Sequence, residues 1–270
     1  MHGPRQGAAR GQRCRAGARL APPDARRPLR PGRTRGDRGA RRSRRHRSRA
    51  GPGAARHRAA RGRRAASVGG CGPALNVELT GPADQVAPGL LGAVVVCGEV
   101  AVRLTEVEAY AGEADPGSHA FRGRTPRSEV MFGPAGVAYV YLSYGMHWCM
   151  NVVTGPDGSA SAVLLRAGQV VEGLDVARER RGGVRDRDLA RGPARLTKAL
   201  GVTGELGGTD LLDPAAPLRL VPGVPVDSSA VRTGPRVGVS GAGAPTPWRF
   251  WVDGDPTVSQ YRPAVVRRRA

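Results

Sequence analysis

Glu106, Glu108 and Tyr110 are the residues whose types and spacing best suit chemistry. They lie in the run Thr105–Tyr110 (TEVEAY), and alternation along a straight strand would place them on one face together with Leu104. Two carboxylates beside a ring are unusual for a structural strand, because an unpaired buried carboxylate is costly. Such a pair suits general acid–base work at a glycosidic bond.

One of the two carboxylates has a structural alternative, as the partner of an arginine elsewhere in the chain. This reading suits Glu106 better, although the periodicity itself treats the two glutamates as equivalent. The candidate partners are Arg103, Arg122 and Arg166. Arg166 follows the apolar run AVLL, which makes it a charge at a strand end, where an ordinary surface cation is the alternative.

The aromatic residues are few and gathered. Of eleven in the chain, seven lie between Tyr110 and Trp148. Flat rings around a polar loop suit stacking on a nucleobase, which contributes about 1 to 3 kcal/mol per base. The alternative is a single aromatic minicore, to which we expect Phe132 and Tyr139 to belong.

Tyr144 precedes a glycine at the end of an apolar strand. The pair Tyr144-Gly145 favours a turn, so the ring is a candidate wedge at a hairpin tip, able to enter an unstacked base step. A core position for Tyr144 is the equal alternative on spacing alone.

The elements that must position these residues are mostly strands. Hairpin spacing dominates over β-α-β spacing, which predicts an α+β domain with an antiparallel sheet. A long loop over 111–134 is expected to be functional. The expected strands span 90–97, 100–110, 137–142, 147–153, 161–167, 236–239 and 248–252, and the expected helices span 169–181 and 193–200, the latter with Pro193 at its first turn and Gly201 as its stop.

Charge divides the chain. Residues 1–70 hold 22 arginines and two acidic residues, a net charge of +20, and residues 71–270 hold the other 21 basic and 20 acidic residues, a net charge of +1. We expect residues 1–72 to be a disordered Arg/Gly/Ala/Pro-rich extension, either a solvated tail or a DNA tether. A domain is expected over 73–262, followed by a basic tail over 263–270. Net charge alone is therefore no argument for nucleic-acid binding by the domain.

Cysteine and apolar patterns exclude several classes. Cys14, Cys71, Cys97 and Cys149 are far apart and form no CxxC pair, which predicts no metal site and a reducing, cytoplasmic setting. The longest apolar stretch is too short to span a membrane. We therefore expect a soluble protein with no membrane partner.

Nine short motifs follow one another in a fixed order. They are Thr105–Tyr110 (TEVEAY), Gly117–His119 (GSH), Arg122–Arg127 (RGRTPR), Val130–Phe132 (VMF), Tyr139–Tyr141 (YVY), Tyr144–Met146 (YGM), Cys149–Asn151 (CMN), Val163–Arg166 (VLLR) and Gly192-Pro193 (GP). This ordered set resembles the alkyladenine (3-methyladenine) DNA glycosylase family over residues 75–262, and the chain looks like an actinobacterial-type member.

The resemblance implies a monofunctional base-excision enzyme with one mixed domain on a curved antiparallel sheet with flanking helices. It needs no cofactor, acts on double-stranded DNA that carries a damaged purine of the 3-methyladenine or hypoxanthine type, and is expected to be a monomer associated with the nucleoid. Glu108 would be the general base that deprotonates a water, and Arg166 would help to hold that water. The choice between the two glutamates comes from this resemblance.

The other implied roles belong to the pocket and the DNA contact. Tyr110, His119, Tyr141 and Asn151 would surround the flipped base, and the Asn151 amide would discourage guanine-type substituents. Tyr144 would fill the gap in the duplex, with Met146 beside it. The expected phosphate contacts are Arg122, Arg124 and Arg127; Ser128-Glu129 departs from the family pattern at that point.

Two other functions remain open from the residues. A two-carboxylate glycoside hydrolase would use both Glu106 and Glu108, and a non-enzymatic nucleic-acid-binding protein would depend on the arginine-rich extension. A lyase mechanism needs an amine in the site. The single lysine, Lys198, lies in an expected surface helix, which argues against lyase activity.

Overall fold

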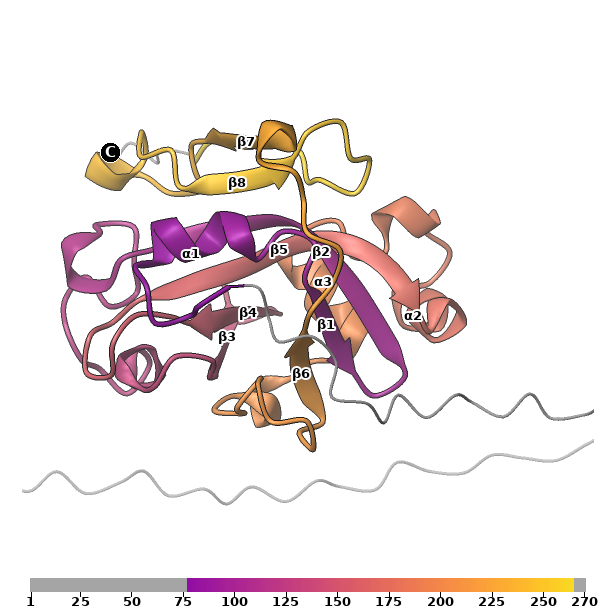
Figure 1. Cartoon of the computed structure of the whole chain (residues 1–270), viewed down its shortest axis with the longest axis horizontal. Coiled ribbons are helices and arrows are strands. Elements are labelled where there is room, and N and C mark those ends of the chain that lie inside the picture. The colour runs from indigo at the N-terminus through magenta and orange to yellow at the C-terminus, as the bar shows by residue number, and fades with distance from the viewer. Residues whose placement is uncertain (1–76, 265–270) are drawn as a thin grey trace, which may run out of the picture. The chain divides into compact units, whose positions relative to one another are not determined.

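A computed structural model describes residues 77–264 of the chain, and every structural statement concerns this part. It contains three α-helices and eight β-strands (Figure 1). The helices are α1 (Ala83–Gly89), α2 (Leu174–Arg181) and α3 (Pro193–Leu200), and the strands are β1 (Val94–Cys97), β2 (Val100–Tyr110), β3 (Ala138–Ser143), β4 (His147–Val153), β5 (Ala162–Glu172), β6 (Leu218–Val221), β7 (Val231–Gly234) and β8 (Arg249–Val252). Short 3₁₀ turns occur in the connections.

All the strand pairs are antiparallel, and β2 is the strand on which the others converge. The sheet runs in the order β3-β4-β5-β2-β1-β6, and β8 also pairs with β2 and carries β7 on its other side. Along one edge, β2 pairs with β5; along the other, its first residues pair with β1 and residues 106–108 pair with β8. The predicted α+β class with an antiparallel sheet is confirmed.

The helices cover the sheet with apolar side chains. Helix α1 packs against β2 and β5, and α3 packs against β4 and β5 (Figure 1). The main core joins these helices to β2, where Leu104, Val107 and Ala109 are fully buried. Burying apolar surface in this way is the main stabilising contribution to the fold.

A β-bulge in β2 overturns one detail of the predicted alternation. The register with β5 passes from Leu104 opposite Gly168 to Glu106 opposite Ala167, which leaves Thr105 as an extra residue. Such a bulge reverses the facing of the side chains that follow it. Leu104 therefore packs in the core. Strict alternation had placed it on the same face as Glu106 and Glu108, and that prediction is wrong.

Several element boundaries differ from the sequence prediction. The hairpin turn at Gly98-Glu99 and the helix that begins at Pro193 and ends before Gly201 are confirmed. The strand expected from residue 90 begins only at Val94, and the helix expected from residue 169 begins at Leu174, because residues 169–172 extend β5 along β2. Neither α1 nor β6 was predicted.

The strand expected over 236–239 does not form, and β7 lies earlier, over Val231–Gly234. The backbone N–H of Val237 is bonded to the Glu108 carboxylate, so it is not available to a strand partner. The predicted extension over 1–72 lies outside the described residues, and of the predicted tail over 263–270 only residues 263 and 264 are described. Within the described part, no helix has the length and apolar character to cross a membrane.

Candidate active site

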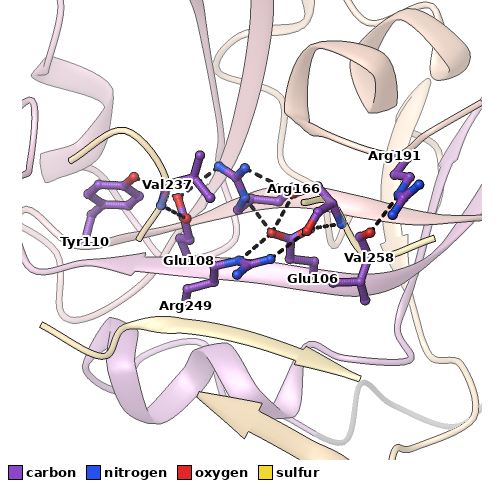
Figure 2. Close-up of polar contacts among 9 residues, drawn as sticks. Glu106, Glu108, Tyr110, Arg166, Arg191, Val237, Arg249 and Val258 are labelled. Atoms are coloured by element: carbon purple, nitrogen blue, oxygen red, sulfur yellow. Dashed lines mark hydrogen bonds and ion pairs between the residues drawn. The ribbon is translucent and has the colours of Figure 1, made fainter. Parts of the chain in front are cut away.

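Glu108 lies on β2 with its carboxylate fully buried and bonded on both oxygens. Oε1 accepts a hydrogen bond from the N–H of Val237 at 2.7 Å (Figure 2). Oε2 accepts from the Tyr110 hydroxyl at 3.0 Å and from Nη1 of Arg166 at 3.2 Å. Strand β2 supplies the carboxylate and the ring, and β5 supplies the cation beside them.

Glu106 lies two residues earlier and has a different set of partners. Its Oε1 accepts from Nε of Arg166 at 2.9 Å and from Nε of Arg249 at 2.7 Å (Figure 2). Its Oε2 accepts from the N–H of Ser259 at 2.7 Å. Of the three arginines expected as partners of a glutamate, Arg166 is the one that bonds Glu106, and it bonds Glu108 as well.

The two carboxylates therefore differ in pKa. Burial raises the pKa of Glu108 above its usual value, because Arg166 and the Val237 N–H offset the loss of water only in part and the nearby Glu106 charge adds to the rise. Burial acts in the same direction on Glu106, but Arg166, Arg249 and the Ser259 hydroxyl outweigh it and hold the pKa of Glu106 below its usual value. Of the two carboxylates, Glu106 is therefore the more strongly held as an anion, and Glu108 accepts a proton more readily.

A cleft of about 830 Å³ opens beside these groups. Its lining includes the four predicted pocket residues Tyr110, His119, Tyr141 and Asn151, together with Arg166. The hairpin tip at residues 143–145, Pro116-Gly117 and the segment 237–240 also line it. Sequence reasoning did not assign Leu164 or Cys149 to this cleft, although each lies inside a motif of the resemblance.

His119 forms part of a cluster of rings in the cleft. Its ring meets that of Tyr141 edge-on at 4.6 Å, and Tyr141 stacks on Tyr139 at 5.3 Å. Arg127 donates to Nε2 of His119, so the neutral ring carries its proton on Nδ1, which bonds the Tyr139 hydroxyl at 3.1 Å. Burial and the Arg127 charge lower the pKa of His119 to about 4, so the ring is neutral at physiological pH.

Asn151 is buried on β4, and its side-chain oxygen has no hydrogen-bond partner within the described residues. A buried polar atom without a partner costs about 1 to 3 kcal/mol. Since Asn151 lines the cleft, a ligand with a suitable donor would satisfy this oxygen.

Tyr144 and Met146 lie at the tip of the hairpin between β3 and β4. Tyr144 is 88% exposed and Met146 is 69% exposed. The backbone of Tyr144 has a positive φ of 50°, a conformation that residues other than glycine rarely adopt. The core alternative for Tyr144 is wrong. Phe132 and Tyr139 are buried in a second, smaller core, as predicted.

The three arginines predicted as phosphate contacts are placed differently. Arg127 lines the cleft. Arg124 pairs with Glu129, the residue at which the chain departs from the family pattern, and its guanidinium lies over Phe132. Arg122 is exposed in the long loop, which contains no α-helix or strand.

Sequence reasoning missed the groups that bind the site from the C-terminal part. Arg249, Ser259 and Val237 bond the two glutamates, and Arg236 is buried against Asp115 with its guanidinium 4.7 Å from the Tyr110 ring centre. These partners are more than 100 residues from β2 in sequence, and no local pattern announces them. Gly238, next to Val237, has a positive φ of 73°, and Gly241 and Gly254 also have positive φ values, but a glycine by itself does not point to a partner of Glu108.

Known proteins match most of the described residues. The family model of methylpurine-DNA glycosylase (MPG) matches residues 78–256. The chain belongs to the methylpurine-DNA glycosylase family. It is therefore an enzyme of the DNA glycosylase class, as the motif order predicted, and its family acts in base excision repair of DNA.

Several relatives in this family carry the provisional name 3-methyladenine DNA glycosylase. The protein of Streptomyces avermitilis is 58% identical over 194 residues, 70% of this chain and 91% of its own length. That of Nocardia farcinica is 58% identical over 191 residues (68% and 90%), and that of Cutibacterium acnes is 52% identical over 192 residues (69% and 99%). The resemblance to an actinobacterial-type member is confirmed.

Proposed function

We propose that this glycosylase flips an alkylated or deaminated purine of the 3-methyladenine or hypoxanthine type out of duplex DNA and hydrolyses its N-glycosidic bond. The observation that carries the proposal is the buried Glu108 carboxylate, with its raised pKa, beside a cleft lined by aromatic rings. A general base is most effective when its pKa lies near the working pH. Relatives named for 3-methyladenine support the substrate class.

Glu108 is proposed to take a proton from the attacking water. Cleavage of the bond leaves positive charge on the sugar, which a nearby carboxylate stabilises. Arg166, which donates to Oε2 of Glu108, is proposed to hold the water against that carboxylate. The other oxygen is fixed by the Val237 N–H, so the carboxylate keeps one orientation during the reaction.

The pocket residues are proposed to recognise the base itself. Tyr110 and Tyr141 offer electron-rich rings, and a cationic methylated purine stacked on such a ring gains about 1 kcal/mol from the cation–π attraction. A neutral His119 adds no positive charge to repel that base. The free oxygen of Asn151 favours a donor group in one orientation of the purine and opposes others.

Tyr144, with Met146 beside it, is proposed to occupy the gap left in the duplex. Extruding a base costs a few kcal/mol of stacking and pairing. An exposed ring at a hairpin tip can restore part of the stacking without any rearrangement of the core. Arg127 at the cleft and Arg122 in the long loop are the proposed phosphate contacts, because Arg124 is engaged by Glu129.

The enzyme is proposed to act without lyase chemistry and as a monomer. Lys198, the one lysine in the chain, is exposed on α3 and lies outside the cleft lining. A Schiff-base intermediate needs an amine at the reacting sugar. Borohydride treatment during the reaction should therefore trap no covalent adduct between Lys198 and DNA.

The direct experiment is a base-release panel on duplexes that carry 3-methyladenine, hypoxanthine, an etheno purine or no lesion. The proposal expects free base from the alkylated and deaminated duplexes and none from intact DNA. Release of sugars from a polysaccharide, with no release of base, would favour the two-carboxylate hydrolase. Against that alternative, Glu106 is held by two arginines and Ser259, which leaves it no role as an acid.

A further inference from the structure

Arg166 is shared between the two glutamates. Its Nε donates to Glu106, its Nη1 donates to Glu108, and its Nη2 donates to the Ser259 hydroxyl at 3.3 Å. A guanidinium is a rigid planar fork, so the bond made by Nε fixes the direction of Nη1. The position of the cation beside Glu108 therefore depends on how Glu106 is held.

Glu106 has a second cation of its own. Arg249 on β8 donates from Nε to the same oxygen that Arg166 bonds, at 2.7 Å (Figure 2). Ser259 adds hydrogen bonds from its hydroxyl and its N–H. Both arginines are buried. Because Arg249 also stabilises the Glu106 carboxylate, Arg166 does not pair with Glu106 alone. Its positive charge can therefore stabilise the Glu108 carboxylate as well.

The residues after β8 form a strap, defined here as residues 255–259, along the same face of β2. Its contacts are a bond between the Thr257 and Thr105 hydroxyls, a bond from Arg103 to Asp255, one from Arg191 to the Val258 carbonyl (Figure 2) and one from Arg249 to the Ser259 carbonyl. The bulge in β2 turns the extra residue, Thr105, toward this strap. The family match ends at residue 256, so Ser259 lies beyond it.

We propose that Glu106, Arg249 and Ser259 form a positioning network that holds Arg166 between the two glutamates and leaves part of its charge to Glu108. The inference rests on the proposed function of Glu108 as the general base. None of the three lines the cleft, and their hydrogen bonds lead to Arg166, which does line it, so we assign them a positioning role.

The network has a pH signature with a definite sign. The charged and titratable groups around Glu108 are Arg166 on β5, Glu106 and Tyr110 on β2, Arg249 opposite it on β8, Arg236 after β7 and Tyr141 on β3. Without the Arg249 cation, Arg166 is drawn toward Glu106 and the pKa of Glu108 rises. Without the Glu106 anion, Arg166 is left to Glu108, whose pKa falls.

The test is a carboxyl titration by NMR on protein labelled with carbon-13 at the glutamate side chains, with Glu108 assigned by its loss in Glu108→Gln. We expect Arg249→Gln to raise the midpoint of Glu108 by about one pH unit, and Glu106→Gln to lower it by a similar amount. The matched control is Arg232→Gln on β7, which breaks an exposed pair with Asp253 and should leave the midpoint unchanged.

Single-turnover base release gives the second readout. The acid limb of its pH profile should shift in the same direction as the titration in each variant. Ser259→Ala removes only the hydrogen bonds of the Ser259 hydroxyl and should raise the titration midpoint of Glu108 less than Arg249→Gln does. This variant replaces the buried substitutions in the test if either of them prevents folding.

The proposal is overturned if folded Arg249→Gln, or folded Ser259→Ala in its place, titrates like the wild type. It is also overturned if both buried variants shift Glu108 in the same direction, since a general loosening of the fold would do that. If the wild type released no base from any duplex, the proposed function would be wrong. The titration midpoints of Glu108 in the variants would still test the positioning network.

Discussion

Asp115 and Arg236 form an ion pair that water does not reach, and it joins two loops of the site. Arg236 donates to both carboxylate oxygens, with Nη2 at 2.7 Å from Oδ1. The same guanidinium packs on the Tyr110 ring, and the next residue, Val237, donates its N–H to Glu108. Loss of the pair should therefore loosen the fold and the catalytic carboxylate together.

We expect Asp115→Asn to lower the free energy of unfolding by about 3 to 5 kcal/mol, the usual cost of removing one partner from a buried ion pair. The cost arises because Arg236 stays buried without its anion. The N–H groups of Ala111 and Gly117 also donate to Asp115 and would compete for the single oxygen of the amide. With a urea m-value of about 2 kcal/mol/M, the midpoint of unfolding falls by about 1.5 to 2.5 M.

Urea unfolding followed by tryptophan fluorescence measures this loss. The matched control is Asp253→Asn, which breaks the exposed pair with Arg232 and should cost at most about 1 kcal/mol. The double variant Asp115→Leu with Arg236→Met should be more stable than Asp115→Asn, since it leaves no buried charge. A midpoint for Asp115→Asn no lower than that of the control would refute the reasoning.

Further predictions concern the cleft. Tyr144→Ala should leave the free energy of unfolding within about 0.5 kcal/mol, while its affinity for an abasic duplex, measured by fluorescence anisotropy, falls about ten-fold; unchanged affinity would contradict the wedge role. The rate of nucleobase release should fall toward acid pH, because the pKa of Glu108 is raised above 4.5 and Glu108 must be ionised to act as the general base. Tyr110→Phe removes a donor to that carboxylate and should move the acid limb up by about one pH unit, and a limb that stays in place would mean that this hydroxyl does not stabilise the base. Asn151→Ala should release hypoxanthine about ten-fold more slowly than the wild type, because it removes the acceptor for a donor group of the purine and one such bond is worth about 1 to 3 kcal/mol; chromatography of free bases would measure the rate, and an unchanged rate would mean that the Asn151 oxygen does not bond the base.

The parts of the fold that sequence predicted are those set by neighbouring residues. The hairpin turn at Gly98-Glu99 and the limits of α3 follow from turn and capping residues and were found where expected. Some of the residues that line the cleft, among them Tyr110 and Tyr141, were also named from sequence, because they lie in short motifs that the resemblance orders; their contact with a base stays a prediction. Local patterns carry this information because they act within a few residues.

The parts that sequence missed depend on contacts made at long range. Strict alternation assumed a straight strand, but β2 has a bulge at Thr105, which lies between the residues that pair with β1 and those that pair with β8. Arg249 looked like any strand cation, although it is the second partner of Glu106 across 143 residues of sequence. The pattern at residues 236–239 predicted a strand, but the backbone N–H of Val237 donates to the Glu108 carboxylate and is not available to a strand partner.

The central claim is that the Glu108 carboxylate activates the water that releases the base. The most direct measurement is single-turnover release of hypoxanthine from a duplex by Glu108→Gln, with the exposed Glu172→Gln as the matched control. We predict a loss of at least about 100-fold for Glu108→Gln, with duplex binding retained and the control unaffected. A folded Glu108→Gln protein that releases the base as fast as the wild type would contradict the account.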